Sequence, residues 1–190
     1  MIKVNTEKTN AKTKSRIWSK RITYIILGWL LILAVIACDT GITVPRYEIR
    51  TDKVAEDIRI VLLTDFHSSS YGDKQQVLID AVEAQNPDVI LLTGDIFEDV
   101  RPHKNSEELL PQLSDKYPCY YVTGNHEEWS GEEEKIKEIV RSCGITVLSG
   151  EYADFGEIRI CGVDNSLYGE QFANCVNSVE DGKFTVLMSH

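Results

Sequence analysis

Four short apolar runs in this sequence each lead to side chains that can bind a metal ion. The runs cover residues 60–64, 89–93, 120–123 and 184–188. In an α/β sheet, ligands bind at the carboxyl ends of the strands, so residues that follow such strands meet in one crevice. Carboxylate, imidazole and amide oxygen gathered there predict a metal site rather than a core. The residues concerned are Asp65, His67, Asp95, Asn125, His126 and His190.

Each of these residues, taken singly, also has a purely structural interpretation. Asp and Asn favour turns and helix caps, and a single His is more often an ordinary surface or core residue. A cap interpretation must, however, explain three strand ends at once, and it does so poorly. The one histidine away from these ends is His103, which we expect to be an exposed loop residue.

Charge is distributed unevenly along the 190 residues. Residues 1–21 hold seven of the 20 basic residues but one of the 30 acidic residues, so the remainder has a net charge of −16. An acidic body repels phosphate backbones, which argues against binding to nucleic acid. The five cysteines form no C-x-x-C pair, which argues against a cysteine zinc site.

Residues 22–38 contain no charged side chain. As a helix they span about 25 Å, near the lower limit for a bilayer core of roughly 30 Å. The basic flank places the N-terminus in the cytoplasm and the domain outside the cell membrane. We therefore interpret residues 1–21 as a cytoplasmic tail, residues 22–38 as a transmembrane signal-anchor and residues 39–57 as a connector. Cleavage near Ala37 and lipidation of Cys38 are the alternatives, in that order.

From residue 58 to residue 190, apolar runs alternate with amphipathic stretches. Strands are predicted at residues 58–64, 89–93, 119–123, 145–148, 157–163 and 184–188, with an edge strand around residues 47–50 of the connector. Helices are predicted at residues 74–84, 106–113, 132–142 and 171–178, the second of them broken by Pro111. This alternation predicts an α/β fold with a mostly parallel sheet covered by helices.

The motifs Asp65-x-His67, Gly94-Asp95 and Gly124-Asn125-His126-Glu127, in this order on strand ends, resemble those of the calcineurin-like metallophosphoesterases. The likeness is greatest to the membrane-anchored bacterial branch of that family and covers residues 46–190. It implies an α/β sandwich of mixed sheets flanked by helices. It also implies a phosphoester substrate, either a phosphodiester or a pyrophosphate, and the expected anchor extends this to lipid-linked esters.

The resemblance assigns a role to each residue of the expected site. Two divalent ions (Mn, Zn or Fe) that lie roughly 3.5–4 Å apart can activate a water molecule and neutralise the charge on phosphate oxygens. Asp95 would bridge both ions, and His126 would protonate the leaving oxygen or stabilise the transition state. The other ligands divide between the ions: Asp65 and His67 on the first, Asn125 and His190 on the second.

Two features bear on how far the resemblance extends. In some members of the family, an acid three residues after the Gly-Asp aspartate orients the catalytic histidine; here that residue is Glu98, followed by Asp99. The family's downstream Gly-His-x-His element is not found before His190, so we expect an incomplete domain. The alternative function is a non-catalytic, membrane-tethered binding protein with an incomplete metal site.

Overall fold

The computed structural model describes residues 18, 20–33, 41–165, 168–177 and 182–190. The chain divides into two compact units, Met1–Pro45 and Arg46–His190. In the first unit, residues 20–33 are helical and exposed. Among the described residues, none of the helices has both the length and the apolar character needed to cross a bilayer. Residues 34–38 of the expected anchor, and nearly all of the expected basic tail, lie outside the described part.

The first sheet of the second unit is entirely parallel. Its strands lie in the order β1 (Ile60–Leu63), β2 (Val89–Thr93), β3 (Cys119–Val122) and β4 (Thr146–Val147). All five residues of β2 are buried, as expected for a central parallel strand that is covered on both faces. The alternation of side chains along β2 directs Val89 and Leu91 to one face and Ile90 and Leu92 to the other.

The second sheet is mixed and packs on the first. Its order is β5 (Glu151–Phe155), β6 (Ile158–Gly162) and β7 (Phe184–Met188), with β5 antiparallel and β7 parallel to β6. Apolar residues from both sheets form one core between them, including Leu91, Tyr120, Ile160 and Met188. The fold is therefore an α/β sandwich with a parallel sheet flanked by helices, as predicted.

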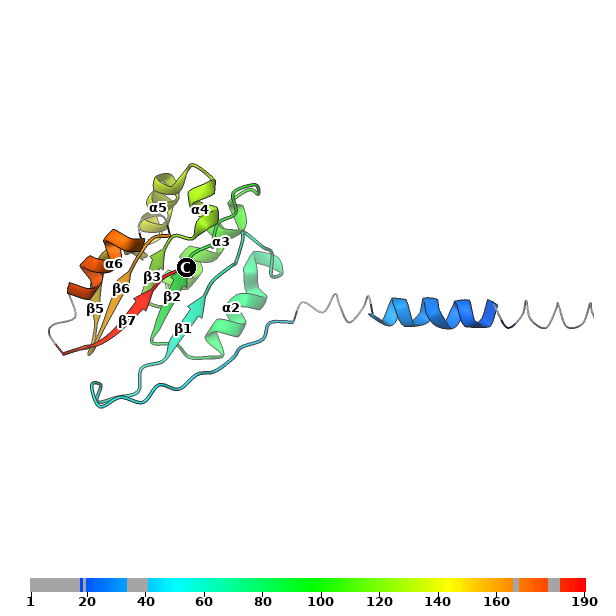
Figure 1. Ribbon diagram of the computed structural model, residues 1–190, viewed down its shortest axis with the longest axis horizontal. Coiled ribbons are helices and arrows are strands. Elements are labelled where there is room, and N and C mark those ends of the chain that lie inside the picture. Colours follow the sequence, from blue (N-terminus) through cyan, green and yellow to red (C-terminus); the bar gives the residue numbers. More distant parts are fainter. Residues whose placement is uncertain (1–17, 19, 34–40, 166–167, 178–181) are drawn as a thin grey trace, which may run out of the picture. The chain divides into compact units, whose positions relative to one another are not determined.

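The helices of the second unit connect the strands and lie outside the sheets (Figure 1). They are the short 3₁₀ helix η1 (Asp73–Gln75), α2 (Gln76–Glu83), α3 (Lys104–Ser114), α4 (Asn125–Trp129), α5 (Glu133–Ser142) and α6 (Tyr168–Asn177).

Three details of the sequence prediction are wrong. Residues 41–59 form no strand, so the expected edge strand at residues 47–50 is absent. Helix α3 continues beyond Pro111, because Leu109, Leu110 and Leu113 are buried on it. Their burial, at about 1.5–3 kcal/mol each, outweighs a cost of about 3 kcal/mol for the proline. The third error is the omission of two short elements, the strand β5 and the helix α4.

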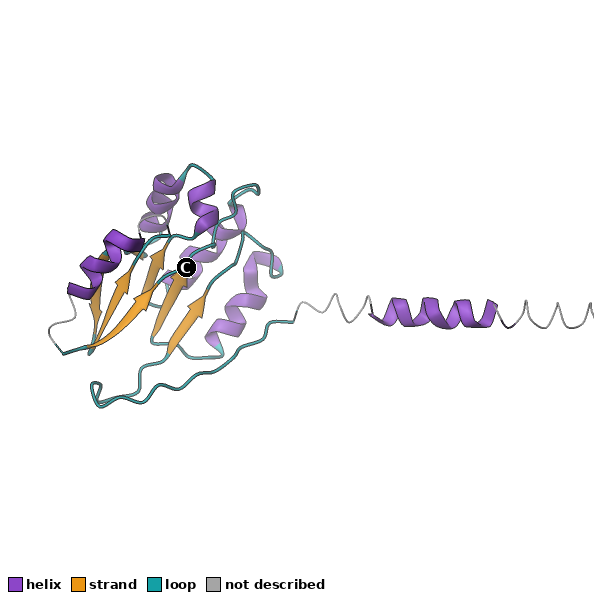
Figure 2. Cartoon of the chain, in the orientation of Figure 1, coloured by secondary structure: helices purple, strands orange, loops and turns teal. Residues whose placement is uncertain are grey.

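The parallel strands of both sheets end at one common edge of the sandwich. The arrowheads of β1, β2, β3 and β7 point toward the same side, and the C-terminus after β7 lies beside the ends of the parallel strands (Figure 2). Residues that follow these four strands in the sequence are therefore brought together, which is the arrangement that the four apolar runs predict.

Candidate metal centre

The loops after β1 and β2 run side by side and are joined by backbone hydrogen bonds. The N–H of Asp65 donates to the carbonyl of Gly94 (3.3 Å), and the N–H of His67 donates to the carbonyl of Asp95 (2.8 Å). Non-glycine residues rarely adopt positive φ angles, and such strained residues gather at functional sites. Four of them lie in these two loops: Asp65 (54°), His67 (50°), Ser68 (48°) and Asp95 (53°).

Two glycines allow the loop after β3 to approach the loop after β2. Gly94 has a φ of 78°, and a Cβ there would lie 2.7 Å from both Gly124 Cα and His190 Cβ. A Cβ on Gly124 would overlap Asp95 Oδ1. Side chains at either position would therefore separate the ends of β2, β3 and β7.

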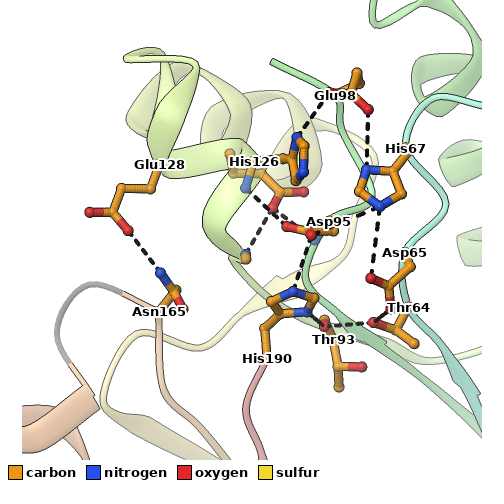
Figure 3. A network of polar contacts seen from close by, with 12 residues as sticks. Thr64, Asp65, His67, Thr93, Asp95, Glu98, His126, Glu128, Asn165 and His190 are labelled. Atoms are coloured by element: carbon orange, nitrogen blue, oxygen red, sulfur yellow. Dashed lines mark hydrogen bonds and ion pairs between the residues drawn. The ribbon is translucent and has the colours of Figure 1, made fainter. Parts of the chain in front are cut away.

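Asp95 is the centre of the cluster and is almost fully buried. Its Oδ2 lies 3.1 Å from His190 Nε2 and 3.9 Å from His67 Nε2, and Asp65 Oδ1 lies 3.7 Å from the same nitrogen of His67 (Figure 3). One possible ligand atom from each of Asp65, His67 and Asp95 lies within 4.8 Å of the other two. Carboxylate and imidazole donors at this spacing fit a divalent transition-metal ion.

His190 is oriented by the backbone of β2. Its Nδ1 lies 3.0 Å from the carbonyl oxygen of Thr93, which can only accept a hydrogen bond. Nδ1 therefore carries the hydrogen of this bond, which leaves Nε2, 3.1 Å from Asp95 Oδ2, as the nitrogen available to a metal ion. This is how proteins commonly orient a metal-binding histidine.

Glu98 lies between the two remaining histidines of the cluster. Its Oε1 is 2.9 Å from His126 Nδ1, and its Oε2 is 3.2 Å from His67 Nδ1, close but without hydrogen-bond alignment. His126 Nδ1 is also 2.9 Å from Asp99 Oδ1. Desolvation alone would lower the pKa of His126, but the bond to Asp99 and the charges of Asp95 and Glu98 outweigh it and raise that pKa.

Glu127 connects the loops through their backbones. It is fully buried, and its carboxylate accepts hydrogen bonds from the N–H groups of Asp95 (2.8 Å), Gly124 (2.8 Å) and Phe97 (2.9 Å). As the third residue of α4, it also caps its own helix through Gly124. The backbone partners of Glu127 could not be read from the sequence, because Asp95 and Phe97 lie 32 and 30 positions earlier in the chain.

A buried ion pair supports the end of β3 from the second sheet. Asp164, two residues beyond β6, accepts hydrogen bonds from the Thr123 hydroxyl (2.9 Å) and from Lys137 Nζ (2.9 Å). Burial raises the pKa of Asp164, but interactions with Lys137, Ser149 and Thr123, chiefly the hydrogen bond and charge of Lys137, outweigh it and lower the pKa overall. Because Thr123 directly precedes Gly124, this pair anchors the turn that carries His126.

The structure brings together most of the residues that the sequence singles out. Asp65, His67, Asp95 and His190 share the contacts described above, and the His126 N–H donates to Asp95 Oδ1 (3.0 Å). Asn125 is the first residue of α4, between two residues that contact Asp95. His103 is not simply an exposed loop residue, because its ring packs edge-on against Phe97 (5.1 Å).

Comparison with known proteins agrees with this geometry. The family model for calcineurin-like phosphoesterases matches residues 58–183, well over half of the chain. The chain therefore belongs to the calcineurin-like phosphoesterase family. A domain of this family implies metal-dependent hydrolysis of a phosphoester substrate.

Several curated relatives carry the same domain. An uncharacterized metallophosphoesterase of Campylobacter jejuni is 27% identical over 185 residues, which cover 89% of this chain and 48% of that protein. One from Helicobacter pylori is 28% identical over 149 residues, or 73% and 40% of the two chains. A transmembrane protein with metallophosphoesterase domain from Danio rerio is 32% identical over 112 residues, or 56% and 26%. The chain spans less than half the length of these relatives.

Proposed function

We propose that this protein hydrolyses phosphodiester or pyrophosphate bonds with a centre of two divalent metal ions. The observation that carries the proposal is the position of Asp95 Oδ2, within 4 Å of an imidazole nitrogen from each side: His67 Nε2 and His190 Nε2. A single carboxylate oxygen between two imidazoles is the arrangement needed for a bridging ligand. In this proposal, Asp65 and His67 hold one ion, and Asn125 and His190 hold the other.

Two ions at this place would supply an activated water and would neutralise the phosphate oxygens. Mn, Zn and Fe all suit mixed carboxylate, imidazole and amide ligands. The protein's own contribution is to hold these ligands in place: Thr93 orients His190, Glu98 lies beside His67, and Glu127 fixes the backbone of Asp95.

His126 is the proposed proton donor to the leaving oxygen. Asp99 and Glu98 hold its Nδ1, so Nε2 is the nitrogen that can reach the substrate. The pKa of His126 is raised by the same carboxylates, which favours the protonated ring that a general acid requires. As the alcohol or phosphate leaves, His126 Nε2 gives its proton to the departing oxygen.

We further propose that the protein acts at a cell membrane. The support is the uncharged segment at residues 22–38 behind a basic tail and the transmembrane relative from Danio rerio. In this arrangement the N-terminus is cytoplasmic, the catalytic domain lies outside, and lipid-linked phosphoesters are within reach. The acidic body continues to argue against nucleic acid as a partner. Susceptibility of the Arg46–His190 unit to protease added outside intact cells tests this location, and full protection would contradict it.

The metal centre is tested with Asp95→Asn and a matched exposed control, Asp57→Asn. Metal content and turnover of bis(p-nitrophenyl) phosphate are measured after loading with Mn²⁺ or Zn²⁺. We expect Asp95→Asn to lose both bound metal and activity, because its charge is shared by both ions, and Asp57→Asn to keep both. Unchanged metal stoichiometry in Asp95→Asn would remove Asp95 from the bridge, and absence of metal-dependent turnover in the wild type would refute the activity.

A further inference from the structure

An exposed tryptophan lies against the proposed proton donor. Trp129 is the last residue of α4, three positions after His126, and its ring centroid lies 5.0 Å from that of His126 at an angle of 55°. Residues three apart lie on the same face of a helix. Trp129 is nevertheless 65% exposed, whereas tryptophan is largely buried on average in folded proteins. It is also the only tryptophan after Trp29 in the sequence.

Contacts on His126 limit where a substrate can approach it. Its Nδ1 is held by Glu98 and Asp99, and its ring lies edge-to-face with that of His67 at 4.6 Å between centroids. Because the Trp129 ring lies 5.0 Å from the His126 ring, a group that receives a proton from Nε2 comes within reach of Trp129. Trp129 offers that group a large apolar surface with one polar N–H.

We propose that Trp129 is a specificity residue that stacks on a flat, unsaturated group in the leaving alcohol, an inference that rests on the proposed function. Stacking of a flat ring on an aromatic side chain is worth about 1–3 kcal/mol. Partial exposure of Trp129 leaves a ring surface for such a contact, and its packing on His126 places this surface beside the scissile bond.

The charges beside Trp129 restrict the leaving group further. Glu128 precedes it, and an open groove next to α4 is lined by four carboxylates, those of Glu128, Glu132, Glu133 and Glu134, against one cation, Lys135, which pairs with Glu132. These carboxylates repel a leaving group that carries further phosphates. The preferred leaving group is therefore uncharged or cationic as well as flat.

The kinetic test compares two methyl phosphodiesters whose leaving alcohols have similar pKa values. One leaving group is phenol, and the other is hexafluoroisopropanol, which is not flat. We expect Trp129→Ala to lower kcat/KM for the phenyl diester about 5- to 100-fold, as the stacking energy predicts, and to change the alkyl diester far less. Trp129→Phe should restore most of the phenyl preference. Tyr47→Ala, another exposed aromatic, is the matched control and should change neither.

Equal losses on both diesters in Trp129→Ala would overturn the proposal, because the tryptophan would then act only by holding His126 in place. That outcome leaves the proposed hydrolysis intact, whereas a wild-type protein without metal-dependent turnover refutes the hydrolysis itself.

A binding measurement gives a readout that does not need turnover. In a Trp18→Phe/Trp29→Phe background, fluorescence reports on Trp129 alone. We expect Zn²⁺-loaded protein to bind phenylphosphonate with a change in Trp129 emission, and to bind methylphosphonate several-fold more weakly. The preference for phenylphosphonate should disappear in Trp129→Ala, as followed by calorimetry. Unchanged emission, or equal affinity for both phosphonates in the wild type, would overturn the proposal.

Discussion

Replacement of Glu127 by Gln tests whether one buried carboxylate holds the loops of the metal centre together. In the wild type, Oε2 accepts two N–H groups, from Asp95 and Gly124, and Oε1 accepts one from Phe97. A Gln oxygen can keep the first two bonds, but its NH₂ group then faces the N–H of Phe97. One bond to a charged acceptor is lost, at about 1.5–3 kcal/mol. The remaining two hydrogen bonds weaken, but that loss is offset because a neutral amide costs less free energy to bury than a carboxylate does.

We therefore expect the free energy of unfolding to fall by about 1.5–3 kcal/mol in Glu127→Gln, a large part of the roughly 5–15 kcal/mol typical of a domain. Urea denaturation with an unchanged slope is the measurement. The matched control is Glu128→Gln, since the neighbouring Glu128 is partly exposed and receives one hydrogen bond, from Asn165 (2.9 Å). We expect a loss below about 1 kcal/mol there. Equal midpoints for the two variants would refute the reasoning.

Other perturbations test the loops, the acid and the buried ion pair. Gly124→Ala should lower metal affinity about 10–100-fold, because the new Cβ overlaps Asp95 Oδ1; calorimetric titration with Zn²⁺ measures it. His126→Ala should keep its metal but lose about 10²–10⁴-fold in rate, and less for diesters whose leaving group needs no proton, in steady-state kinetics. Because the folded-state pKa of Asp164 is lowered, the unfolded chain binds more protons below pH of about 4. The free energy of unfolding should therefore decrease as the pH is lowered through that window. A plot of urea midpoint against pH should be flatter for Asp164→Asn than for the wild type.

Each of these outcomes has a result that would contradict it. Gly169→Ala, where a Cβ meets nothing within 4 Å, is the control for the glycine variant, and equal metal affinities in both would show that the close approach is unimportant. Equal rate losses across leaving groups in His126→Ala would indicate charge stabilisation rather than proton donation. An Asp164→Asn variant with the wild-type pH slope would show that this carboxyl does not titrate with folding.

The most apolar strands were the most predictable part of the fold. The bounds of β2 and β7 agree with those predicted, because each is an uninterrupted apolar run with polar or glycine residues on either side. Strand β5 was not predicted because Glu151 and Asp154 disfavour strands. It forms because its backbone pairs with β6 and because Asp154 meets Arg159 across the ladder (2.9 Å). That support is tertiary and leaves no local pattern.

For the candidate site, the sequence located the side chains but not their supports. Strand-end positions were sufficient to place Asp65, His67, Asp95 and His190 in one cluster. Contacts between distant segments could not be read in the same way. The lysine that faces Asp164 lies 27 positions earlier in the chain, and nothing in the local sequence of either residue indicates the other.

The backbone bonds between the loops after β1 and β2 bear on which metal ions the proposed centre would accept. The carbonyls of Gly94 and Asp95 fix the positions of Asp65 and His67 through bonds that involve protein atoms alone. Ligands held in this way are not rearranged to suit one particular ion, so the cage discriminates by donor type and spacing. Carboxylate and imidazole donors accept most first-row divalent ions, with affinities that follow the Irving–Williams series. If the proposed centre holds metal in this way, its occupancy would depend on the supply of ions in the compartment where the protein folds, and a change in that supply would exchange the metal without any change in the sequence.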